Sequence, residues 1–348
     1  MVVVMKPNAT EVQIEAATHK LKAFGFQVHR VTGVTRTILG AIGEPEGGDA
    51  RELEVLDGVH EVLEITEPYK LASRGFKPEG TVIELDGVRI GGDEVVMMAG
   101  PCTIESEEQI QAIARIVAAA GAKVLRGGAF KPRTSPYSFQ GLGAAGLRMM
   151  REAADAHGLL IVTEVRAVDQ VALVAEYADI LQIGTRNMQN YDLLKAVGNV
   201  DRPVLLKRGM AATIKELLMA AEYIMAEGNE QVTLCERGIR SFGDHHRFLL
   251  DVSAIPAIKE RSHLPIIVDP SHAAGIRKPV MALARAGVAA GADGLLVEIH
   301  HDPGNALCDG AQALLPEDFI RLMDELGRIA EVIGRRITRR QVEEATVS

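Results

Sequence analysis

The sequence is poor in the features that mark secreted or membrane proteins. It has no tryptophan, 4% aromatic residues and only three cysteines among 348 residues. So few cysteines exclude a disulfide framework and predict reduced thiols. No segment approaches the roughly 18 consecutive apolar residues of a membrane span, and the apolar run at the N-terminus is too short for a signal peptide. We therefore expect a cytoplasmic protein with no membrane partner.

Positive charge is also scarce. Lysine and arginine number 38 against 47 acidic residues, so the formal net charge is −9. This balance argues against a nucleic-acid partner, and each local group of cations needs its own explanation. The segment RGGAFKPRTSPYSFQG, from Arg126 to Gly141, carries three fixed positive charges and no carboxylate. Such a segment in an acidic protein indicates an anionic ligand.

The first 67 residues predict a ferredoxin-like α+β domain with the order βαββαβ. Its strands and helices are expected at residues 1–5, 9–24, 26–31, 35–42, 50–56 and 59–65. Residues 68–80 are polar and rich in Pro and Gly, which predicts a linker. Alternation on both sides of Asp86-Gly87 predicts a hairpin at the start of the next domain.

From Val95 onward, eight short apolar segments alternate with eight amphipathic ones. This pattern predicts parallel strands covered by helices, and its length fits a (β/α)8 TIM barrel over residues 81–338, followed by a tail at 339–348. The helices are expected at 106–119, 142–157, 168–177, 190–197, 213–227, 253–261, 278–290 and 316–333. A doubly wound open sheet is the alternative, although no G-x-G-x-x-G fingerprint follows the first strand.

Each predicted strand ends on or beside a residue that can take part in chemistry. In chain order these residues are Cys102, Arg126, Glu164, Arg186, Lys207, Arg237, His272 and Glu298. In a β/α barrel these strand ends meet at the face that carries the active site. Four of the residues are cations, and Lys131 and Arg133 follow the second strand. Converging cations suit phosphate and carboxylate groups, and this number suits two phosphorylated molecules. The alternative is that some of them pair with acids such as Glu164, Glu236 or Asp269, or face the solvent.

Three of the other strand-end residues belong to a potential metal-ligand set. Cys102, His272 and Glu298, together with Asp309 on the loop after the last strand, offer a thiolate, an imidazole and two carboxylates. This mixture favours Mn, Fe, Co or Zn over Mg or Ca. His301 competes for the metal, and Cys102 taken alone is also compatible with a packing role. Cys235 is expected in the core, and Cys308 has no assigned task.

These motifs together resemble a known family. AGPCTIES, LRGGAFKPRTSPYSFQGLG, IGTRNMQN, LLKRG, CERGIRSF and VDPSHAAG, with the acids at Glu298 and Asp309, are similar to 3-deoxy-D-arabino-heptulosonate 7-phosphate (DAHP) synthases. The resemblance is to the type I subgroup with an N-terminal ferredoxin-like regulatory domain, and it extends from residue 1 to about residue 335. It implies a transferase that condenses phosphoenolpyruvate with erythrose 4-phosphate and releases phosphate, at the entry to the shikimate pathway.

The resemblance also implies roles for individual residues. The metal, preferably Mn²⁺ with Fe²⁺, Co²⁺ or Zn²⁺ as alternatives, would be held by Cys102, His272, Glu298 and Asp309. Phosphoenolpyruvate would be bound by Arg126, Lys131, Arg186, Lys207 and Arg237. Erythrose 4-phosphate would be bound by Arg133 and Thr134. The catalytic set would be Lys131, as proton donor to the aldehyde oxygen, with Cys102 and His272.

Alternatives to this function differ in what they predict. The sister enzyme that joins phosphoenolpyruvate to arabinose 5-phosphate, 3-deoxy-8-phosphooctulonate synthase, carries a K-A-N-R-like segment where this chain has KPRTSP. A metal-dependent aldolase would release no phosphate, and a silent phosphate-binding barrel would turn nothing over. The resemblance further suggests inhibition by an aromatic amino acid and a homotetramer. The N-terminal domain could instead serve oligomerisation or act as a lid, and His29 is expected at its surface.

Overall fold

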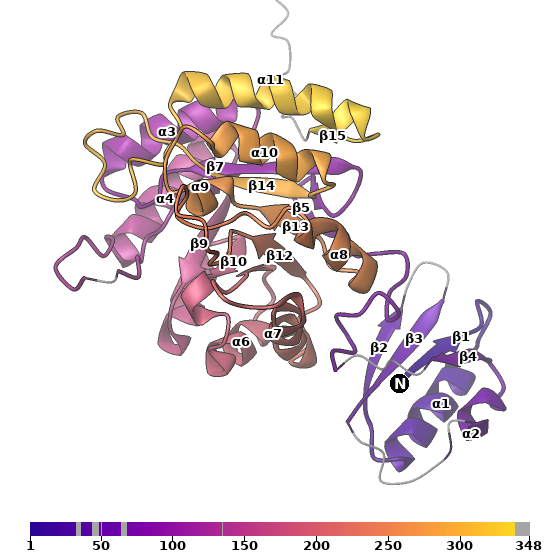
Figure 1. Ribbon diagram of the computed structural model, residues 1–348. Helices are drawn as coiled ribbons and strands as arrows, with labels where there is room; N and C mark the ends of the chain where they lie inside the picture. Colours follow the sequence, from indigo (N-terminus) through magenta and orange to yellow (C-terminus); the bar gives the residue numbers. More distant parts are fainter. Residues whose placement is uncertain (33–35, 44–48, 50, 64–67, 134, 338–348) are drawn as a thin grey trace, which may run out of the picture. The chain divides into compact units, whose positions relative to one another are not determined.

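Eight parallel strands close into a barrel in this computed structural model, which describes residues 1–32, 36–43, 49, 51–63, 68–133 and 135–337 (Figure 1). Each strand pairs with the next along the chain, and the last pairs with the first, so the predicted TIM barrel is confirmed. The strands are β7 (Glu94–Gly100), β8 (Val124–Arg126), β9 (Leu160–Val165), β10 (Ile180–Ile183), β11 (Val204–Lys207), β12 (Val232–Glu236), β13 (Ile266–Val268) and β14 (Gly294–Glu298).

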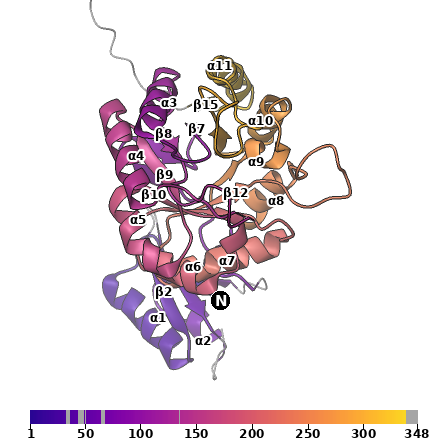
Figure 2. The same cartoon turned by 90° about the vertical axis from the view of Figure 1, so that its left-hand side faces the viewer.

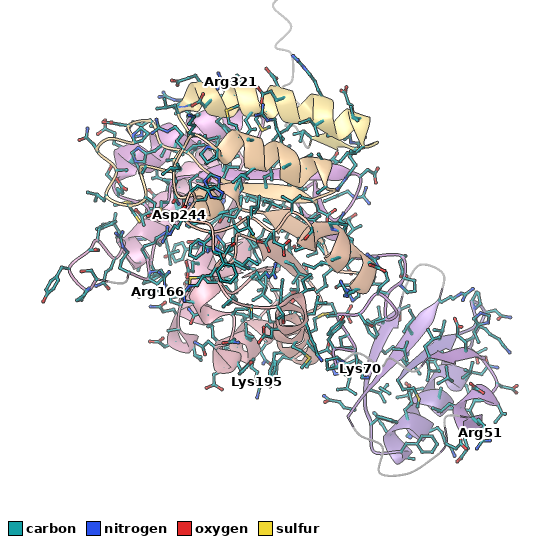
Figure 3. All side chains as sticks on the ribbon, in the orientation of Figure 1. Arg51, Lys70, Arg166, Lys195, Asp244 and Arg321 are labelled. Atoms are coloured by element: carbon teal, nitrogen blue, oxygen red, sulfur yellow. The ribbon has the colours of Figure 1, made fainter. Side chains whose placement is uncertain are left out.

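Helices surround the strands, as Figure 2 shows for α3 to α7. The main helices are α3 (Glu107–Ala119), α4 (Ala144–His157), α5 (Val171–Tyr177), α6 (Tyr191–Gly198), α7 (Ile214–Ala226), α8 (Ala254–Arg261), α10 (Val280–Ala289) and α11 (Pro316–Val332). Charged side chains such as Lys195 on α6 and Arg321 on α11 are exposed on these helices (Figure 3). Among the described helices, none has both the length and the hydropathy that crossing a bilayer requires.

One short helix was not expected from the sequence. Helix α9 (Pro270–Ala274) follows β13 directly, with Pro270 in its first turn. The Asp269 side chain caps it by accepting a hydrogen bond from the backbone N–H of His272. An acceptor at the N-cap followed by proline is a recognised helix start, but five residues give too little periodicity to detect.

The barrel interior is filled by apolar side chains from all eight strands. One buried cluster joins residues such as Val96, Val162 and Leu296 to the hairpin formed by β5 (Ile83–Leu85) and β6 (Val88–Ile90). Cys235 belongs to this cluster, so its predicted packing role is confirmed. Strand β15 (Arg336–Ile337) adds to the outer side of the sheet by pairing with β7.

The N-terminal unit has the predicted ferredoxin-like order. Its elements are β1 (Val2–Met5), α1 (Glu11–Ala23), β2 (Gln27–Thr32), β3 (Thr37–Ile42), α2 (Arg51–Glu54) and β4 (Val59–Leu63), and the antiparallel sheet has the order β2-β3-β1-β4. Helix α1 begins with a capping box between Thr10 and Gln13. His29 on β2 is half-buried, and its Nε2 has no hydrogen-bond partner.

Two compact units divide the chain, and the first includes residues that follow the ferredoxin-like fold. It comprises Met1–Gly80 together with Glu260–His263, and the second comprises Thr81–Lys259 and Leu264–Ser348. Within the first unit Phe76 is buried and lies against Gly40, where a Cβ would be only 2.6 Å from the Phe76 ring. His263 Nε2 lies 2.6 Å from the carbonyl oxygen of Leu71. Residues 68–80 therefore pack within this unit.

Candidate active site

The carboxyl ends of the barrel strands surround a cavity of about 280 Å³. Most of the predicted site residues line it: Cys102, Arg126, Lys131, Arg133, Arg186, Lys207, Arg237, His272 and Asp309. Glu298 lies beneath them with 1% of its surface exposed. Thr134 falls outside the described residues. The structure thus brings together side chains that are up to 207 positions apart in the sequence.

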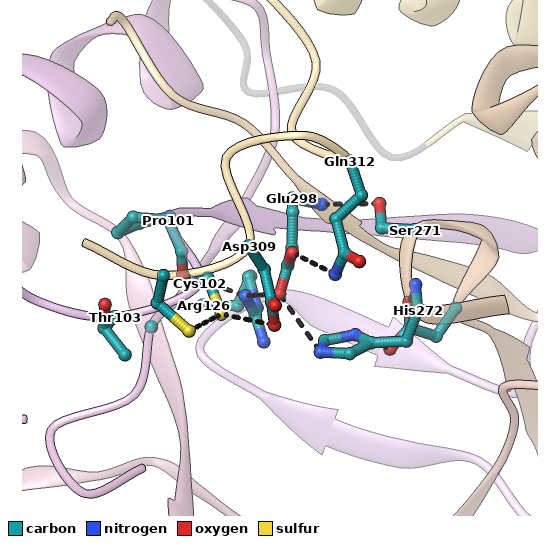
Figure 4. A network of polar contacts seen from close by, with 12 residues as sticks. Pro101, Cys102, Thr103, Arg126, Ser271, His272, Glu298, Asp309 and Gln312 are labelled. Atoms are coloured by element: carbon teal, nitrogen blue, oxygen red, sulfur yellow. Dashed lines mark hydrogen bonds and ion pairs between the residues drawn. The ribbon is translucent and has the colours of Figure 1, made fainter. Parts of the chain in front are cut away.

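Four of these side chains can each offer one ligand atom to a single metal ion. The ligand atoms of Cys102, His272, Glu298 and Asp309 all lie within 4.8 Å of one another. Figure 4 shows Glu298 at the end of β14, His272 on α9, and Cys102 and Asp309 on loops, with their side chains turned toward one another. A thiolate, an imidazole and two carboxylates at this spacing fit a divalent transition ion. His301, the expected competitor, is exposed and does not belong to the group.

His272 is held by Asp269, a residue to which the sequence assigned only a possible ion pair. The imidazole Nδ1 lies 2.7 Å from Asp269 Oδ2, while Nε2 faces Glu298 Oε1 at 3.2 Å. A carboxylate can only accept hydrogen bonds, and Nδ1 has the closer carboxylate oxygen, so the single proton of the neutral ring lies on Nδ1 and Nε2 has a free lone pair. Burial lowers the pKa of His272 to about 4. The ring is therefore neutral at neutral pH and suited to bind a metal.

Glu298 is held by both of its oxygens. Oε1 accepts a hydrogen bond of 2.8 Å from Arg126, and Oε2 accepts one of 2.6 Å from Gln312 (Figure 4). Burial opposes the negative charge, but the charges of Arg126 and Lys131 help to lower the pKa of Glu298 below its ordinary value. Arg126 also donates to the carbonyl oxygen of Pro101, and its Nε has no partner.

The loop after β8 places Lys131 and Arg133 beside the metal group. Lys131 Nζ lies 2.7 Å from Cys102 Sγ and 3.5 Å from Asp309 Oδ2. Burial alone would favour the neutral amine, but the Cys102 sulfur and the acids Glu298 and Asp309 raise the pKa of Lys131. Arg133 donates to Cys308 Sγ at 2.9 Å. Lys131 is thus a charged donor that reaches into the cavity.

A second cysteine lies beside Cys102. Cys308 Sγ lies 3.3 Å from Cys102 Sγ, although the sequence assigned Cys308 no task. Burial raises the pKa of the Cys102 thiol well above its ordinary value, with a further contribution from Cys308 and Glu298. A metal ion would reverse this effect by binding the thiolate form.

The cations of the cavity differ in how they are paired. Lys207 forms an ion pair with Asp269, and Arg126 forms one with Glu298, so the expected pairing with acids applies to these two. Arg237 stacks on the Phe248 ring at 4.3 Å, and its buried Nε and Nη1 have no hydrogen-bond partner. Burial also lowers the pKa of Arg237, which an anionic ligand would offset. Arg237 thus has donors available for an anion.

Glu164 and Gln182 lie side by side at the floor of the cavity. They are register partners on the parallel strands β9 and β10, and both line the cavity. Burial raises the pKa of Glu164, although Lys131, Lys207 and other cations counteract it. Gly184 lies so close that a Cβ there would be 2.0 Å from Glu164 Oε1. Glu164 is therefore a carboxyl group suited to exchange a proton with a bound molecule.

Sequence reasoning missed several residues of this site. Two of them line the cavity, namely Gln182 and Arg247. The other two contact potential metal ligands: Asp269 contacts His272, and Gln312 donates a hydrogen bond to Glu298. Asp269 had a detectable signal, because it precedes Pro270 in the VDPSH motif and could have been read as a helix cap. Gln312 has no signal of this kind, since its contact with Glu298 depends on the path of the loop after β14.

The chain matches two family descriptions that together span most of its length. Residues 76–333 match the DAHP synthetase I family, and residues 1–67 match the DAHP synthase ferredoxin-like domain. The chain is 48% identical over 337 residues to phospho-2-dehydro-3-deoxyheptonate aldolase of Thermotoga maritima, which covers 97% of this chain and 100% of that protein. A crystal structure of DAHP synthase from Thermotoga maritima aligns with a TM-score of 0.78 over 97% of this chain and 98% of that chain.

The sister enzymes are more distant. The 2-dehydro-3-deoxyphosphooctonate aldolase of Geobacter sulfurreducens is 32% identical over 272 residues, which cover 72% of this chain and 98% of that protein. A 33% match over 270 residues is found with the corresponding aldolase of Syntrophotalea carbinolica. The chain therefore belongs to the DAHP synthetase I family and is an enzyme, a transferase of the DAHP synthase type with an N-terminal ferredoxin-like domain.

Proposed function

We propose that this enzyme condenses phosphoenolpyruvate with erythrose 4-phosphate in a metal-dependent reaction, giving DAHP and inorganic phosphate as the first step of the shikimate pathway. The observation that carries the proposal is a group of four potential metal ligands that shares one cavity with cations from several strands. The family match and the name of the Thermotoga maritima relative support the same chemistry.

The two substrates would be held by different cations. Arg186 and Arg237 would bind the phosphate of phosphoenolpyruvate, and Arg126 and Lys207 its carboxylate. Arg133, with Thr134 from outside the described residues, would bind the phosphate of erythrose 4-phosphate. The unpaired donors of Arg237 and the contacts of Lys131, on the loop after β8, with Cys102 and Asp309 support this division. Binding two anions together requires such a set of cations to suppress their mutual repulsion.

The chemistry joins C3 of phosphoenolpyruvate to the aldehyde carbon of erythrose 4-phosphate. Lys131 would donate a proton to the aldehyde oxygen as the new C–C bond forms. Water then adds to C2, and the resulting hemiketal phosphate loses inorganic phosphate by C–O cleavage. Glu164, whose pKa burial raises, is a candidate to accept the proton of that water. When bound by Cys102, His272, Glu298 and Asp309, a divalent ion supplies Lewis-acid polarisation of the aldehyde.

The metal, the effector and the assembly belong to the same proposal. Mn²⁺ is the preferred ion, with Fe²⁺, Co²⁺ and Zn²⁺ as alternatives, because the donor set contains both sulfur and oxygen. The ferredoxin-like domain match supports inhibition by an aromatic amino acid. A homotetramer in the cytoplasm completes the proposal.

One assay of phosphate release tests the reaction and the need for a metal. The enzyme is supplied with phosphoenolpyruvate and either erythrose 4-phosphate or arabinose 5-phosphate, before and after treatment with a chelator. We expect phosphate release with erythrose 4-phosphate, its loss on chelation and its recovery with Mn²⁺. Cys102→Ala is expected to lose turnover, because the metal group then lacks its sulfur ligand.

Other outcomes contradict separate parts of the proposal. A preference for arabinose 5-phosphate would identify the sister activity, and condensation without phosphate release would indicate an aldolase. Full turnover by metal-free Cys102→Ala enzyme would overturn the metal assignment but would not affect the assignment of the two substrates.

A further inference from the structure

Asp269 connects the cation set of the cavity with the metal group. Its side chain is fully buried at the end of β13. Oδ1 accepts a hydrogen bond of 2.9 Å from the backbone N–H of His272, while Oδ2 lies 2.7 Å from His272 Nδ1 and also forms the ion pair with Lys207. Three donors therefore converge on the two oxygens of one carboxylate.

We propose that Asp269 is a positioning residue that fixes His272 with its Nε2 lone pair turned toward the metal. This inference rests on the metal site of the proposed function. The carboxylate requires a proton on Nδ1, so the neutral ring has none on Nε2. Nε2 faces Glu298 Oε1 at 3.2 Å and is the ligand atom on the side of the metal group. Histidine ligands commonly have such a carboxylate partner, which fixes their orientation and tautomer.

The local backbone makes this arrangement specific to Asp269. The same side chain caps α9 and holds the ring of His272, the third residue of that helix, so both the cap and the tautomer depend on Asp269. Lys207 also donates a hydrogen bond to Oδ2. A cation therefore balances the negative charge of Asp269, and the carboxylate does not have to bind the metal. Burial opposes that charge, but His272 and Lys207 hold the pKa of Asp269 well below its ordinary value.

Asp269→Asn tests the proposal because it keeps the shape of the side chain and changes its hydrogen bonding. If the amide oxygen caps α9, the NH₂ group faces Lys207 and the ring, which drives the ring proton to Nε2. We expect the Kd for Co²⁺, measured by visible absorption, to rise about 10- to 100-fold. Turnover should recover when Mn²⁺ is raised in proportion.

A matched control is Asp293→Asn. Asp293 is also a buried carboxylate, but it accepts hydrogen bonds from Lys259 and the backbone of Ile266 at the amino ends of the strands. Its substitution should lower the free energy of unfolding and leave the affinity for Co²⁺ unchanged. An equal loss of Co²⁺ affinity in both variants would mean that general destabilisation, and not the orientation of His272, weakens the site.

A second pair of variants includes one that leaves no unpaired charge in the buried Lys207–Asp269 pair, because the unpaired Lys207 of Asp269→Asn could prevent folding. Lys207→Met removes the cation, and Lys207→Met with Asp269→Asn removes both charges. We expect the first to bind Co²⁺ as the unsubstituted enzyme does, and the second to bind it about 10- to 100-fold more weakly. The readout is metal affinity alone, because Lys207 belongs to the proposed substrate site.

The outcomes separate this inference from the proposed function. Equal Co²⁺ affinity with and without the Asp269 carboxylate overturns the positioning role and leaves the metal site intact. If the unsubstituted enzyme binds no Co²⁺, the metal site itself is wrong, and the inference falls with it.

Discussion

Gly184 illustrates how one small residue sets the position of a reactive group. A Cβ at this position would lie 2.0 Å from Glu164 Oε1, and only the end of a flexible side chain would have to move. Gly184→Ala should therefore leave the fold intact and lower kcat about 10- to 100-fold by displacing the Glu164 carboxyl. Steady-state kinetics together with a thermal melt measure the two effects.

Gly92→Ala is the control for that substitution, since its nearest neighbour would be Arg89 at 3.7 Å, an ordinary contact. It should change neither kcat nor the melting temperature. Unchanged kcat in folded Gly184→Ala enzyme would show that the observed position of Glu164 is not needed for the reaction.

At the scale of residues, the sequence predicts which groups meet but not how they pair. The sequence shows apolar strands that each end on or beside a reactive residue. Because the ends of parallel strands share one face of a barrel, this pattern predicted that Cys102, His272 and Glu298 lie close together. The pairings of Asp269 with His272 and of Gln312 with Glu298 depend on rotamers and loop paths that no periodicity records.

The segment Glu260–His263 yields a prediction at the scale of elements. His263 is buried, and burial lowers its pKa to about 4, while in the unfolded chain the ordinary value applies. As the pH falls below about 6.5, the unfolded state binds a proton that the folded state does not, so stability is lost. This residue should lower the free energy of unfolding by about 2 kcal/mol between pH 7 and pH 5.

Urea unfolding of the enzyme and of His263→Gln at both pH values checks this expectation. Gln keeps a donor for the Leu71 carbonyl oxygen but does not titrate, so its stability should depend less on pH. Exposed His60 provides the comparison, and His60→Gln should follow the unsubstituted enzyme. Parallel pH curves for all three proteins would contradict the assignment to His263.

Elements were predicted to within a few residues where their periodicity is long. The expected helix at 316–333 is α11 (Pro316–Val332), and the one at 213–227 is α7 (Ile214–Ala226). Helix α9 was missed because it spans little more than one turn. The sequence also did not predict that residues 68–80 pack within the first unit. Tyr69, Leu71 and Phe76 are buried there, but they stand among polar residues in the sequence and therefore show no apolar periodicity.

For the whole molecule, the closed barrel followed from counting eight alternations, and the N-terminal fold from its order of elements. Neither pattern indicates whether the N-terminal unit changes the activity of the barrel. The proposed regulation therefore has to be tested by removing the N-terminal unit. All the proposed site residues lie between Cys102 and Asp309, within the second unit. A truncated form of DAHP synthase from Thermotoga maritima, 48% identical, aligns with 77% of this chain and 98% of that chain at a TM-score of 0.72.

A chain that begins at Thr81 should therefore keep the condensation activity and lose inhibition by tyrosine or phenylalanine, which we expect to slow the full-length enzyme. It should also be less stable, because Glu260–His263 lose their packing partners, among them the Leu71 carbonyl oxygen. The test is to measure phosphate release by the full-length and the shortened enzyme in the presence of each amino acid. If the shortened enzyme is still inhibited, the effector binds the barrel; if the full-length enzyme responds to neither amino acid, the N-terminal domain serves assembly or acts as a lid and not as the sensor.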